Sequence, residues 1–354
     1  MIAQAAAALS EGNALRAAGR LPEAADAYRR AIALAPQQGA GYYNLGIALR
    51  QARDLRGAAL AFREAARRDP ADFDAVQNAV DTVAIAVRAG DPPLFARDAP
   101  AADVDGEGVS IVVCSVDDAR LAATRANFGA ALGGMANEIV AIRDARSLAE
   151  GYNRGLAAAR YPIAVLAHDD VELLSPRPFH ALARALRDHD LVGLAGSRRV
   201  TGPAVAWSGH PHLHGWIAYP AAEGWDATVF SLEAGILGGV QALDGMLIAG
   251  RRDAMRAIGF DAHTFDGFHF YDLDFCHRAH LAGLRLAVTT EVSAVHASEG
   301  RFDDEWRRYA ERFRAKFPAL DRPAGAHHSY AVRLGSREQV LRHYEELRGL
   351  AAAA

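Results

Sequence analysis

The segment Tyr161–Leu173 reads Y-P-I-A-V-L-A-H-D-D-V-E-L, and the order of its apolar and polar residues decides the fold around it. The apolar run Ile163–Ala167 predicts a strand that is buried on both faces, as in a parallel sheet. His168, Asp169 and Asp170 follow directly, at the position where open α/β sheets bind their ligands. Carboxylates favour hard cations such as Mg²⁺, so the pattern indicates a cation site. Alternatively, the two aspartates cap the next turn or helix.

From Val109 onward, apolar runs alternate with amphipathic segments. Further strands are expected at Val109–Ser115, Glu138–Arg143, Leu191–Ala195, Met246–Ala249 and Leu284–Val288. Helices are expected at Asp118–Leu132, Ser147–Ala159, Pro176–Asp188, from Asp272 up to Gly283, at Asp303–Lys316 and at Ser336–Leu350. This alternation implies a parallel sheet with right-handed connections. No G-x-G-x-x-G motif follows the first expected strand, which disfavours a dinucleotide-binding fold.

Residues 1–88 are rich in Ala, contain no strand-like run and repeat with a period of about 34 residues. The matching positions are Gly12 with Gly46, Leu15 with Leu49, Ala24 with Ala58, Tyr28 with Phe62, Ala31 with Ala65 and Pro36 with Pro70. This pattern resembles the tetratricopeptide (TPR) repeat, in which small residues let paired helices approach closely. A third repeat begins near Asp72 and then loses the pattern, so the array is expected to lean on the next domain. The alternative is an ordinary pair of helical hairpins.

The central part of the chain, about residues 108–318, resembles the family 2-like glycosyltransferases of the GT-A fold. The resemblance is carried by H-D-D at 168–170, S-I-V-V-C-S at 110–115, E-I-V-A-I-R-D at 138–144, G-Y-N-R-G at 151–155, L-D-G-M-L-I-A at 243–249 and Y-D-L-D-F-C-H-R at 271–278. It implies an α/β fold of GT-A type. A mostly parallel nucleotide-binding sheet would be flanked by helices and preceded by the all-α TPR module.

In that family, an acidic D-x-D motif holds a divalent metal, Mn²⁺ or Mg²⁺, on the donor diphosphate. By this resemblance Asp170 is the best metal ligand, while His168 departs from the motif by replacing its first acidic residue. His296 falls where the family often places a His that reaches the metal or the diphosphate; a lone His is otherwise structural. Asp272 matches the carboxylate that acts as the base, and Tyr271 replaces the Glu that usually precedes it.

The resemblance also implies a set of donor-binding residues. These are Ser115 and Asp117 at the first nucleotide loop, Asp144 at the base, Asn153 in the helix before the acidic motif, and Asp169. The alternative for each loop aspartate is a turn-forming role. Asp274 and Arg278 lie four residues apart, so they are also expected to form an ion pair on the helix.

Asp272 also has an alternative role to that of the base, because it lies near the start of an expected helix. There the exposed N–H groups and the helix dipole would lower its pKa, so that it is ionised at neutral pH. The alternative to a catalytic role is that Asp272 only caps this helix.

The segment Thr201–Trp225 is irregular and rich in His, Trp and Gly. His210, His212 and His214 would share one face of an extended segment, which fits a zinc site, whereas the loop composition fits a surface loop for the acceptor. Trp207 and Trp216 either stack on sugar rings or belong to the core.

The composition excludes several classes of partner. A net charge of −4 and a pI near 6.4 indicate no bulk binding to nucleic acid or to an anionic membrane. No apolar run approaches the roughly 18 residues of a membrane span, and the N-terminus lacks the features of a signal peptide. Cys114 and Cys276 are not spaced as metal ligands, so they are expected to be reduced core residues. A cytoplasmic protein is therefore expected.

Four segments follow: TPR-like repeats at 1–88, a linker at 89–108, a glycosyltransferase domain at 109–320 and an extension with a helix at 321–354. The expected activity is metal-dependent transfer of a sugar, with inversion, from a nucleotide-diphosphate donor to a saccharide or protein acceptor. The repeats would recruit the acceptor or a protein partner. The alternatives are a non-catalytic TPR scaffold with a degenerate transferase domain, and a nucleotidyltransferase.

Overall fold

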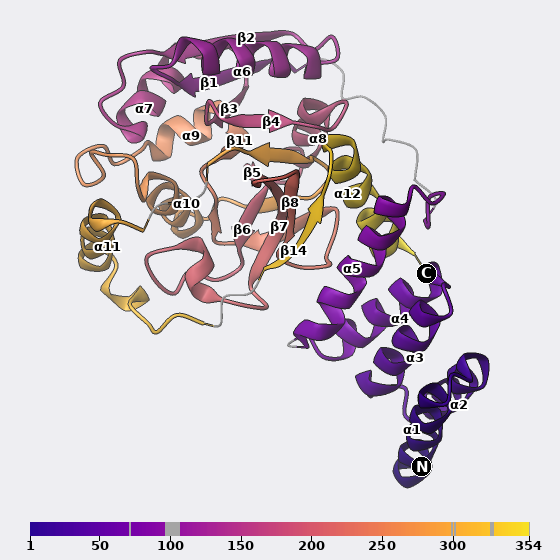
Figure 1. Cartoon of the computed structure of the whole chain (residues 1–354). Coiled ribbons are helices and arrows are strands. Elements are labelled where there is room, and N and C mark those ends of the chain that lie inside the picture. Colours follow the sequence, from indigo (N-terminus) through magenta and orange to yellow (C-terminus); the bar gives the residue numbers. More distant parts are fainter. Residues whose placement is uncertain (71, 96–106, 299, 301, 326–328, 354) are drawn as a thin grey trace. The chain divides into compact units, whose positions relative to one another are not determined.

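The computed structural model describes residues 1–70, 72–95, 107–298, 300, 302–325 and 329–353, except for the side chain of Trp207 (Figure 1). Most of the expected linker therefore lies outside the described residues. The chain divides into two compact units. A helical unit comprises Met1–Ala99, Gly224–Leu232 and Ser329–Ala354, and a sheet unit comprises Pro100–Glu223 and Glu233–His328.

The helical unit begins with antiparallel helices whose close packing explains the sequence repeat. The helices are α1 (Ile2–Ala17), α2 (Leu21–Leu34), α3 (Gly39–Gln51), α4 (Leu55–Arg68) and α5 (Phe73–Ala89). A Cβ atom on Gly12 would lie 2.5 Å from the ring of Tyr28, and one on Gly46 would lie 2.8 Å from the ring of Phe62. Only glycine therefore lets each aromatic ring pack between its pair of helices. This confirms that the small residues of the repeat allow the helices to approach closely.

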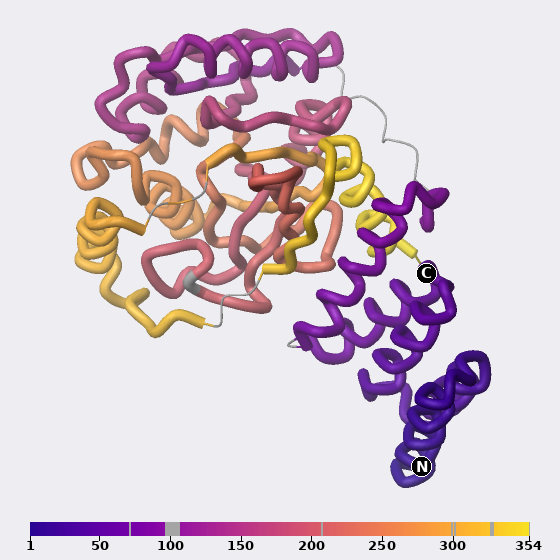
Figure 2. The backbone as a smooth tube through the Cα atoms, in the orientation of Figure 1, coloured from indigo at the N-terminus to yellow at the C-terminus, as the bar shows by residue number. Residues whose placement is uncertain are grey.

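The third repeat, which the sequence leaves incomplete, is continued by the C-terminal segment. Helix α5 packs against strand β14 (Tyr330–Leu334) and helix α12 (Arg337–Ala352), which the tube in Figure 2 shows as the yellow end of the chain. Strand β14 pairs antiparallel with β8 (Trp225–Val229). The Glu346 carboxylate of α12 accepts 3.1 Å hydrogen bonds from the backbone N–H groups of Leu94 and Phe95. The start of the expected linker is thus held by the C-terminal helix.

The main sheet of the sheet unit has the strand order β2-β1-β3-β11-β5-β12-β9. Its strands are β1 (Val109–Cys114), β2 (Asn137–Ile142), β3 (Ile163–Ala167), β5 (Leu191–Gly193), β9 (Ile236–Val240), β11 (Leu247–Arg251) and β12 (Leu286–Thr289). Strand β1 pairs in parallel with β2 and β3, as expected, and Figure 1 shows these strands side by side. All residues of β3 are buried, which confirms the interpretation of its apolar run. Strand β11 runs antiparallel between β3 and β5, so the sheet is mixed beyond its parallel half.

A second sheet path has the order β10-β6-β7-β13-β4. Its strands are β4 (Val171–Leu173), β6 (Ala195–Ser197), β7 (Leu213–Pro220), β10 (Ala242–Leu243) and β13 (Ala294–His296). The expected strand Leu191–Ala195 is divided at Leu194, because its residues pair first in one sheet, as β5, and then in the other, as β6.

Helices flank these sheets close to the positions expected from the sequence. They are α6 (Asp118–Ala131), α7 (Leu148–Ala158), α8 (Pro178–Ala185), α9 (Arg252–Ile258), α10 (Tyr271–Leu281) and α11 (Asp304–Lys316), with 3₁₀ turns at Val205–Ser208 and Pro318–Leu320. Cys276 is buried and Cys114 half-buried, and both thiols are free. Within the described ranges, none of the helices combines the length and apolarity needed to cross a membrane.

Candidate functional site

Two strand ends bring the expected metal ligands together. Strand β3 ends at Ala167, and the next backbone N–H, of His168, donates to the carbonyl of Met246 at 3.0 Å. Strand β13 ends at His296, which pairs with Val171 in β4, directly after Asp170. This pairing places His296 beside the residues that follow β3, although His168 and His296 lie 128 positions apart in the chain.

The side chains of His168, Asp170 and His296 form a compact cluster. Their ligand-type atoms all lie within 4.8 Å of one another, and all three side chains are half-buried. His296 Nε2 lies 3.3 Å from Asp170 Oδ1 and 3.3 Å from His168 Nδ1. Two imidazole nitrogens and one carboxylate oxygen make a suitable donor set for a divalent transition-metal ion. The cluster therefore fits the cation that the acidic motif implies.

The electrostatic environment sets the protonation of this cluster. Burial acts to raise the pKa of Asp170, but hydrogen bonds from His296 and Ser298 outweigh it and hold that pKa well below its usual range. Burial acts to lower the pKa of His296, but the hydrogen bond to Asp170 and the fields of nearby carboxylates raise it overall. Burial and the neighbouring His296 lower the pKa of His168. Asp170 is thus ionised and His168 neutral at neutral pH.

Tyr271 contacts this cluster, a role that the sequence analysis did not assign to it. Its hydroxyl lies 2.6 Å from His168 Nε2 and 3.2 Å from the carbonyl oxygen of Gly245. His168 and Tyr271 are the two residues that depart from the acidic pattern of the resembling family, and the structure places them in direct contact. That both residues stand where the family has acidic residues was the one indication in the sequence that they act together.

Asp272 lies next to Tyr271 in the first turn of α10. Its Oδ2 accepts a 2.8 Å hydrogen bond from the backbone N–H of Gly245. Burial and then the neighbouring Asp244 raise its pKa to about 7, against the backbone hydrogen bonds that lower it. The expectation of a lowered pKa was therefore wrong, because desolvation outweighs the field of the helix terminus. The cap position of α10 is occupied by Phe270, so Asp272 is not the cap residue.

Three of the residues expected to bind the donor nucleotide follow the carboxyl ends of parallel strands. Asp117 follows β1 and caps α6, accepting hydrogen bonds from the backbone of Ala119 and Arg120. The hydroxyl of Ser115 donates to the carbonyl of Asp117 at 3.0 Å. Asp169 Oδ1 lies 3.7 Å from an Arg120 guanidinium nitrogen. Ser115, Asp117 and Asp169 thus border one region around the start of α6.

Two further candidates have structural partners. Asn153 donates to the carbonyl of Phe260 and accepts from its backbone N–H, both at 2.8 Å, so both ends of the amide bind the backbone. Asp144 is exposed after β2 and pairs with Arg154 at 2.7 Å. The structure does not bring either side chain to the cluster around His168.

The ion pair between Asp274 and Arg278 is present, at 2.8 Å, and belongs to a larger network. Lys316 Nζ lies 2.6 Å from Asp274 and 2.6 Å from Asp261. Arg278 also donates to the carbonyl groups of Ile258 and Gly259. This network joins α10 to α11 and to the loop after α9.

The histidines of the irregular segment do not form a second cation site. Among the described residues, the cluster of His168, Asp170 and His296 is the one group of three His, Cys, Asp or Glu side chains arranged to hold a metal ion. His214 is buried in β7, and burial lowers its pKa to about 4. Trp216 is 2 % exposed, so it belongs to the core and does not stack on a sugar. The side chain of Trp207 lies outside the described part.

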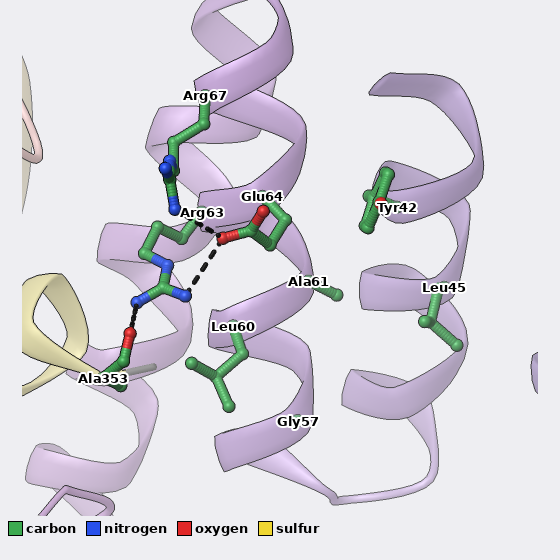
Figure 3. Close-up of a pocket in the computed structure, with 9 residues that line it drawn as sticks. All are labelled: Tyr42, Leu45, Gly57, Leu60, Ala61, Arg63, Glu64, Arg67 and Ala353. Atoms are coloured by element: carbon green, nitrogen blue, oxygen red, sulfur yellow. Dashed lines mark hydrogen bonds and ion pairs between the residues drawn. The ribbon is translucent and has the colours of Figure 1, made fainter. Parts of the chain in front are cut away.

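A separate open pocket lies within the helical unit (Figure 3). It is lined by Tyr42, Leu45, Gly57, Leu60, Ala61, Arg63, Glu64, Arg67 and Ala353. Arg63 Nη1 donates to the carbonyl of Ala353 at 2.5 Å, and Glu64 accepts from Arg63 and Arg67 at 3.0 and 3.3 Å. The charges of the pocket are thus paired with one another.

Two family models match parts of this chain. A TPR-repeat model matches residues 12–52. No curated protein matches the chain. Among solved structures, the mannosyltransferase PcManGT from Pyrobaculum calidifontis, in complex with GDP-Man and Mn²⁺, is 16% identical with a TM-score of 0.39, over 70% of this chain and 77% of that one. A197 from STIV is 14% identical with a TM-score of 0.32, over 54% and 86% of the two chains. The model of the glycosyltransferase-like family matches residues 110–317, more than half of the chain, and the chain therefore belongs to this family.

Proposed function

We propose that the sheet unit transfers a sugar from a nucleotide-diphosphate donor to an acceptor hydroxyl group, with a divalent cation, Mn²⁺ or Mg²⁺, and with inversion at the sugar. One observation carries the proposal. A carboxylate whose pKa lies near neutrality, Asp272, shares the backbone of Gly245 with Tyr271, which contacts the cation-type cluster. The candidate base and the candidate cation site are thus linked through Gly245.

The cluster residues have a binding role in this proposal. His168, Asp170 and His296 would hold the cation, which when bound supplies Lewis-acid stabilisation of the leaving diphosphate. Ser115, Asp117 and Asp169 border the region around the start of α6, where the donor nucleotide would lie. Asp144 and Asn153 remain donor-binding candidates, although each must exchange its present partner to meet a nucleotide.

Asp272 has the role of general base. One of its oxygens is held by Gly245, which orients the carboxylate. The carboxylate removes the proton of the acceptor hydroxyl while the acceptor oxygen bonds to the anomeric carbon and the bond from that carbon to the diphosphate breaks. A base is most effective when its pKa lies near the working pH, which a pKa of about 7 satisfies. A single displacement of this kind inverts the anomeric centre.

The TPR module would supply the acceptor or a protein partner. Repeat arrays of this kind present extended surfaces for binding other chains. The open pocket of the helical unit combines apolar residues with the paired charges described above and is a candidate site for such a chain.

The rival function is a non-catalytic TPR scaffold with a degenerate transferase domain, supported by the non-acidic residues His168 and Tyr271. Their mutual contact favours the active enzyme, because it gives both residues a place beside Asp170 and His296 in the cation-type cluster.

A screen of nucleoside diphosphates with Mn²⁺ or Mg²⁺, read by thermal shift, tests the proposal. A ligand at 100 times its Kd should stabilise the protein by about 2.7 kcal/mol. Hydrolysis of the matching nucleotide sugar should follow at a measurable rate. A protein that binds no nucleoside diphosphate with either cation, and hydrolyses no donor, would be the scaffold.

A further inference from the structure

We infer that Tyr271 fixes His168 in the tautomer whose bare Nδ1 faces the cluster, so that two imidazoles and one carboxylate select a first-row transition-metal ion over Mg²⁺. The inference deepens the proposed function and rests on its cation site. Tyr271 is then a positioning residue, because it acts on the cation only through His168.

The groups at the two ends of one chain of contacts determine which atom donates and which accepts in each hydrogen bond between them. The chain runs from Asp170 through His296, His168 and Tyr271 to the carbonyl of Gly245, with successive distances of 3.3, 3.3, 2.6 and 3.2 Å. Both ends can only accept, since one is an ionised carboxylate and the other a peptide carbonyl. In the cation-free chain His296 Nε2 therefore carries a proton, which faces Asp170 and His168 and leaves when a cation binds this nitrogen.

This first assignment determines the others. His168 Nδ1 faces the protonated Nε2 of His296, so it must be the acceptor. Because Nδ1 accepts, the ring proton of His168 lies on Nε2, which donates to the Tyr271 hydroxyl, and that hydroxyl donates to Gly245. With the opposite tautomer, two N–H groups would face each other between His168 and His296. For the four contacts of this chain, only one arrangement gives each a donor and an acceptor, with the His296 N–H shared between Asp170 and His168.

Packing holds the hydroxyl of Tyr271 in place. Tyr271 is 4 % exposed, and its ring packs against the rings of Tyr152 and Phe260. A Cβ atom at Gly245 would lie 2.1 Å from the Tyr271 hydroxyl oxygen, so this close approach requires glycine. A hydrogen bond on the distal nitrogen of a histidine ligand fixes its tautomer and ring orientation and commonly changes metal affinity about 10- to 100-fold when removed.

The donor set determines which cation fits. Mg²⁺ prefers oxygen ligands, whereas imidazole nitrogen favours transition metals. An acidic residue at position 168 would give the site a second carboxylate, and His168 gives it a second imidazole. The hydroxyl of Tyr271 suits the imidazole at position 168, because it can accept the Nε2 proton, whereas a carboxylate at position 271 would bring a further charge.

The test measures cation binding to the full chain without any donor. Calorimetry gives the Kd for Mn²⁺, Zn²⁺ and Mg²⁺, and pulsed electron paramagnetic resonance counts the nitrogen nuclei coupled to bound Mn²⁺. We expect two coupled nitrogens, and Mg²⁺ binding at least 10-fold weaker than Mn²⁺. One nitrogen or none, or equal affinity for Mn²⁺ and Mg²⁺, overturns the inference without any variant.

Variants test the role of Tyr271 separately. Tyr271→Phe keeps the ring and should weaken Mn²⁺ binding about 10-fold or more. His168→Asp should leave one coupled nitrogen and narrow the difference between Mn²⁺ and Mg²⁺. Tyr309→Phe is the matched control, because this buried tyrosine donates its hydroxyl to Asp266, and it should bind Mn²⁺ within twofold of the parent. Tyr271→Phe binding within twofold of the parent overturns the positioning role.

The outcomes separate this inference from the proposed function. Two nitrogen ligands together with no affinity for any nucleoside diphosphate would support the cation site and reject sugar transfer from such a donor. Cation-dependent donor binding that is equally strong with Mg²⁺ and Mn²⁺, and unchanged in Tyr271→Phe, would support the transferase and reject the inference.

Discussion

The backbone N–H of Gly245 donates a 2.8 Å hydrogen bond to Oδ2 of Asp272, while the carbonyl of the same Gly245 accepts from Tyr271. One residue without a side chain therefore orients the candidate base and the partner of the candidate metal ligand. Any side chain at this position would collide with both, since a Cβ atom would lie 2.1 Å from Tyr271 Oη and 2.9 Å from Asp272 Cβ.

Asp272→Asn should lower sugar transfer by about 10² to 10⁴ while leaving donor affinity near that of the parent, because Asn accepts the Gly245 hydrogen bond but not a proton. Initial rates at saturating donor, with donor Kd from calorimetry, check this. Asp266→Asn is the control, since that carboxylate pairs with Arg312 at the surface. Transfer within a few-fold of the parent would remove Asp272 from the role of base.

The pH dependence of kcat/KM should show an acidic limb near pH 7. The pKa of Asp272 is raised to about 7, and a general base acts only when it is deprotonated, so activity should fall about tenfold per pH unit below that value. The expected measurement is a profile from pH 5 to about 8 in which Asp272→Asn has lost this limb. An acidic limb near pH 4 would show that Asp272 has its ordinary pKa in the active enzyme.

Local pattern was sufficient for most elements. The run Ile163–Ala167 is strand β3 residue for residue, and the 34-residue offset that matches Gly12 with Gly46 predicted the helical repeats. The direction of each strand in the sheet was harder to predict, because an apolar run such as β11 has the same composition whether it pairs parallel or antiparallel. Its placement between β3 and β5 depends on long-range pairing.

The candidate site also depends on long-range contacts that local sequence patterns do not reveal. The motifs placed His168 and Asp170 at a strand end, but the contact between His168 and Tyr271 joins residues 103 positions apart. The raised pKa of Asp272 depends on burial and on Asp244, which lies in another segment. The prediction from the helix terminus considered only the local field, so it gave the wrong direction for the pKa shift of Asp272.

Asp170→Ala should abolish cation-dependent nucleotide binding while the protein stays folded. Asp170 supplies the one carboxylate of the cluster, and its loss removes the charge that attracts a divalent ion. Calorimetry with a nucleoside diphosphate, with and without Mn²⁺, measures the effect. Asp253→Ala, at a surface carboxylate that pairs with Arg252, is the control. Undiminished Mn²⁺-dependent binding in Asp170→Ala would show that the cation is held elsewhere.

The helical unit should lose stability as the pH falls below about 6.5. His343 on α12 is fully buried, and burial, with Arg88, lowers its pKa to about 3. Above its ordinary pKa of 6.5 both folded and unfolded chains hold it neutral. Between about 6.5 and 3, the unfolded chain binds the proton first, so folding is disfavoured.

Thermal unfolding from pH 7.5 to about 4.5 should therefore show a steeper loss of Tm for the parent than for His343→Leu, which has no titrating group at this position. His263→Leu, at an exposed histidine, should keep the slope of the parent. Parallel slopes for the parent and His343→Leu would contradict the burial of a neutral imidazole.

Lys316 is the single lysine among 39 basic residues, and its ammonium lies 2.6 Å from both Asp261 and Asp274. Asp274 is completely buried and also pairs with Arg278, so Lys316→Met removes one of its two cationic partners and should destabilise the sheet unit by about 1.5–3 kcal/mol. Arg314→Met is the matched control on the same helix, because Arg314 pairs with Asp321 near the surface and such pairs contribute about 0–1 kcal/mol. Denaturant unfolding measures both variants. An equal, small loss for the two would show that Arg278 alone neutralises Asp274 and that the lysine is dispensable.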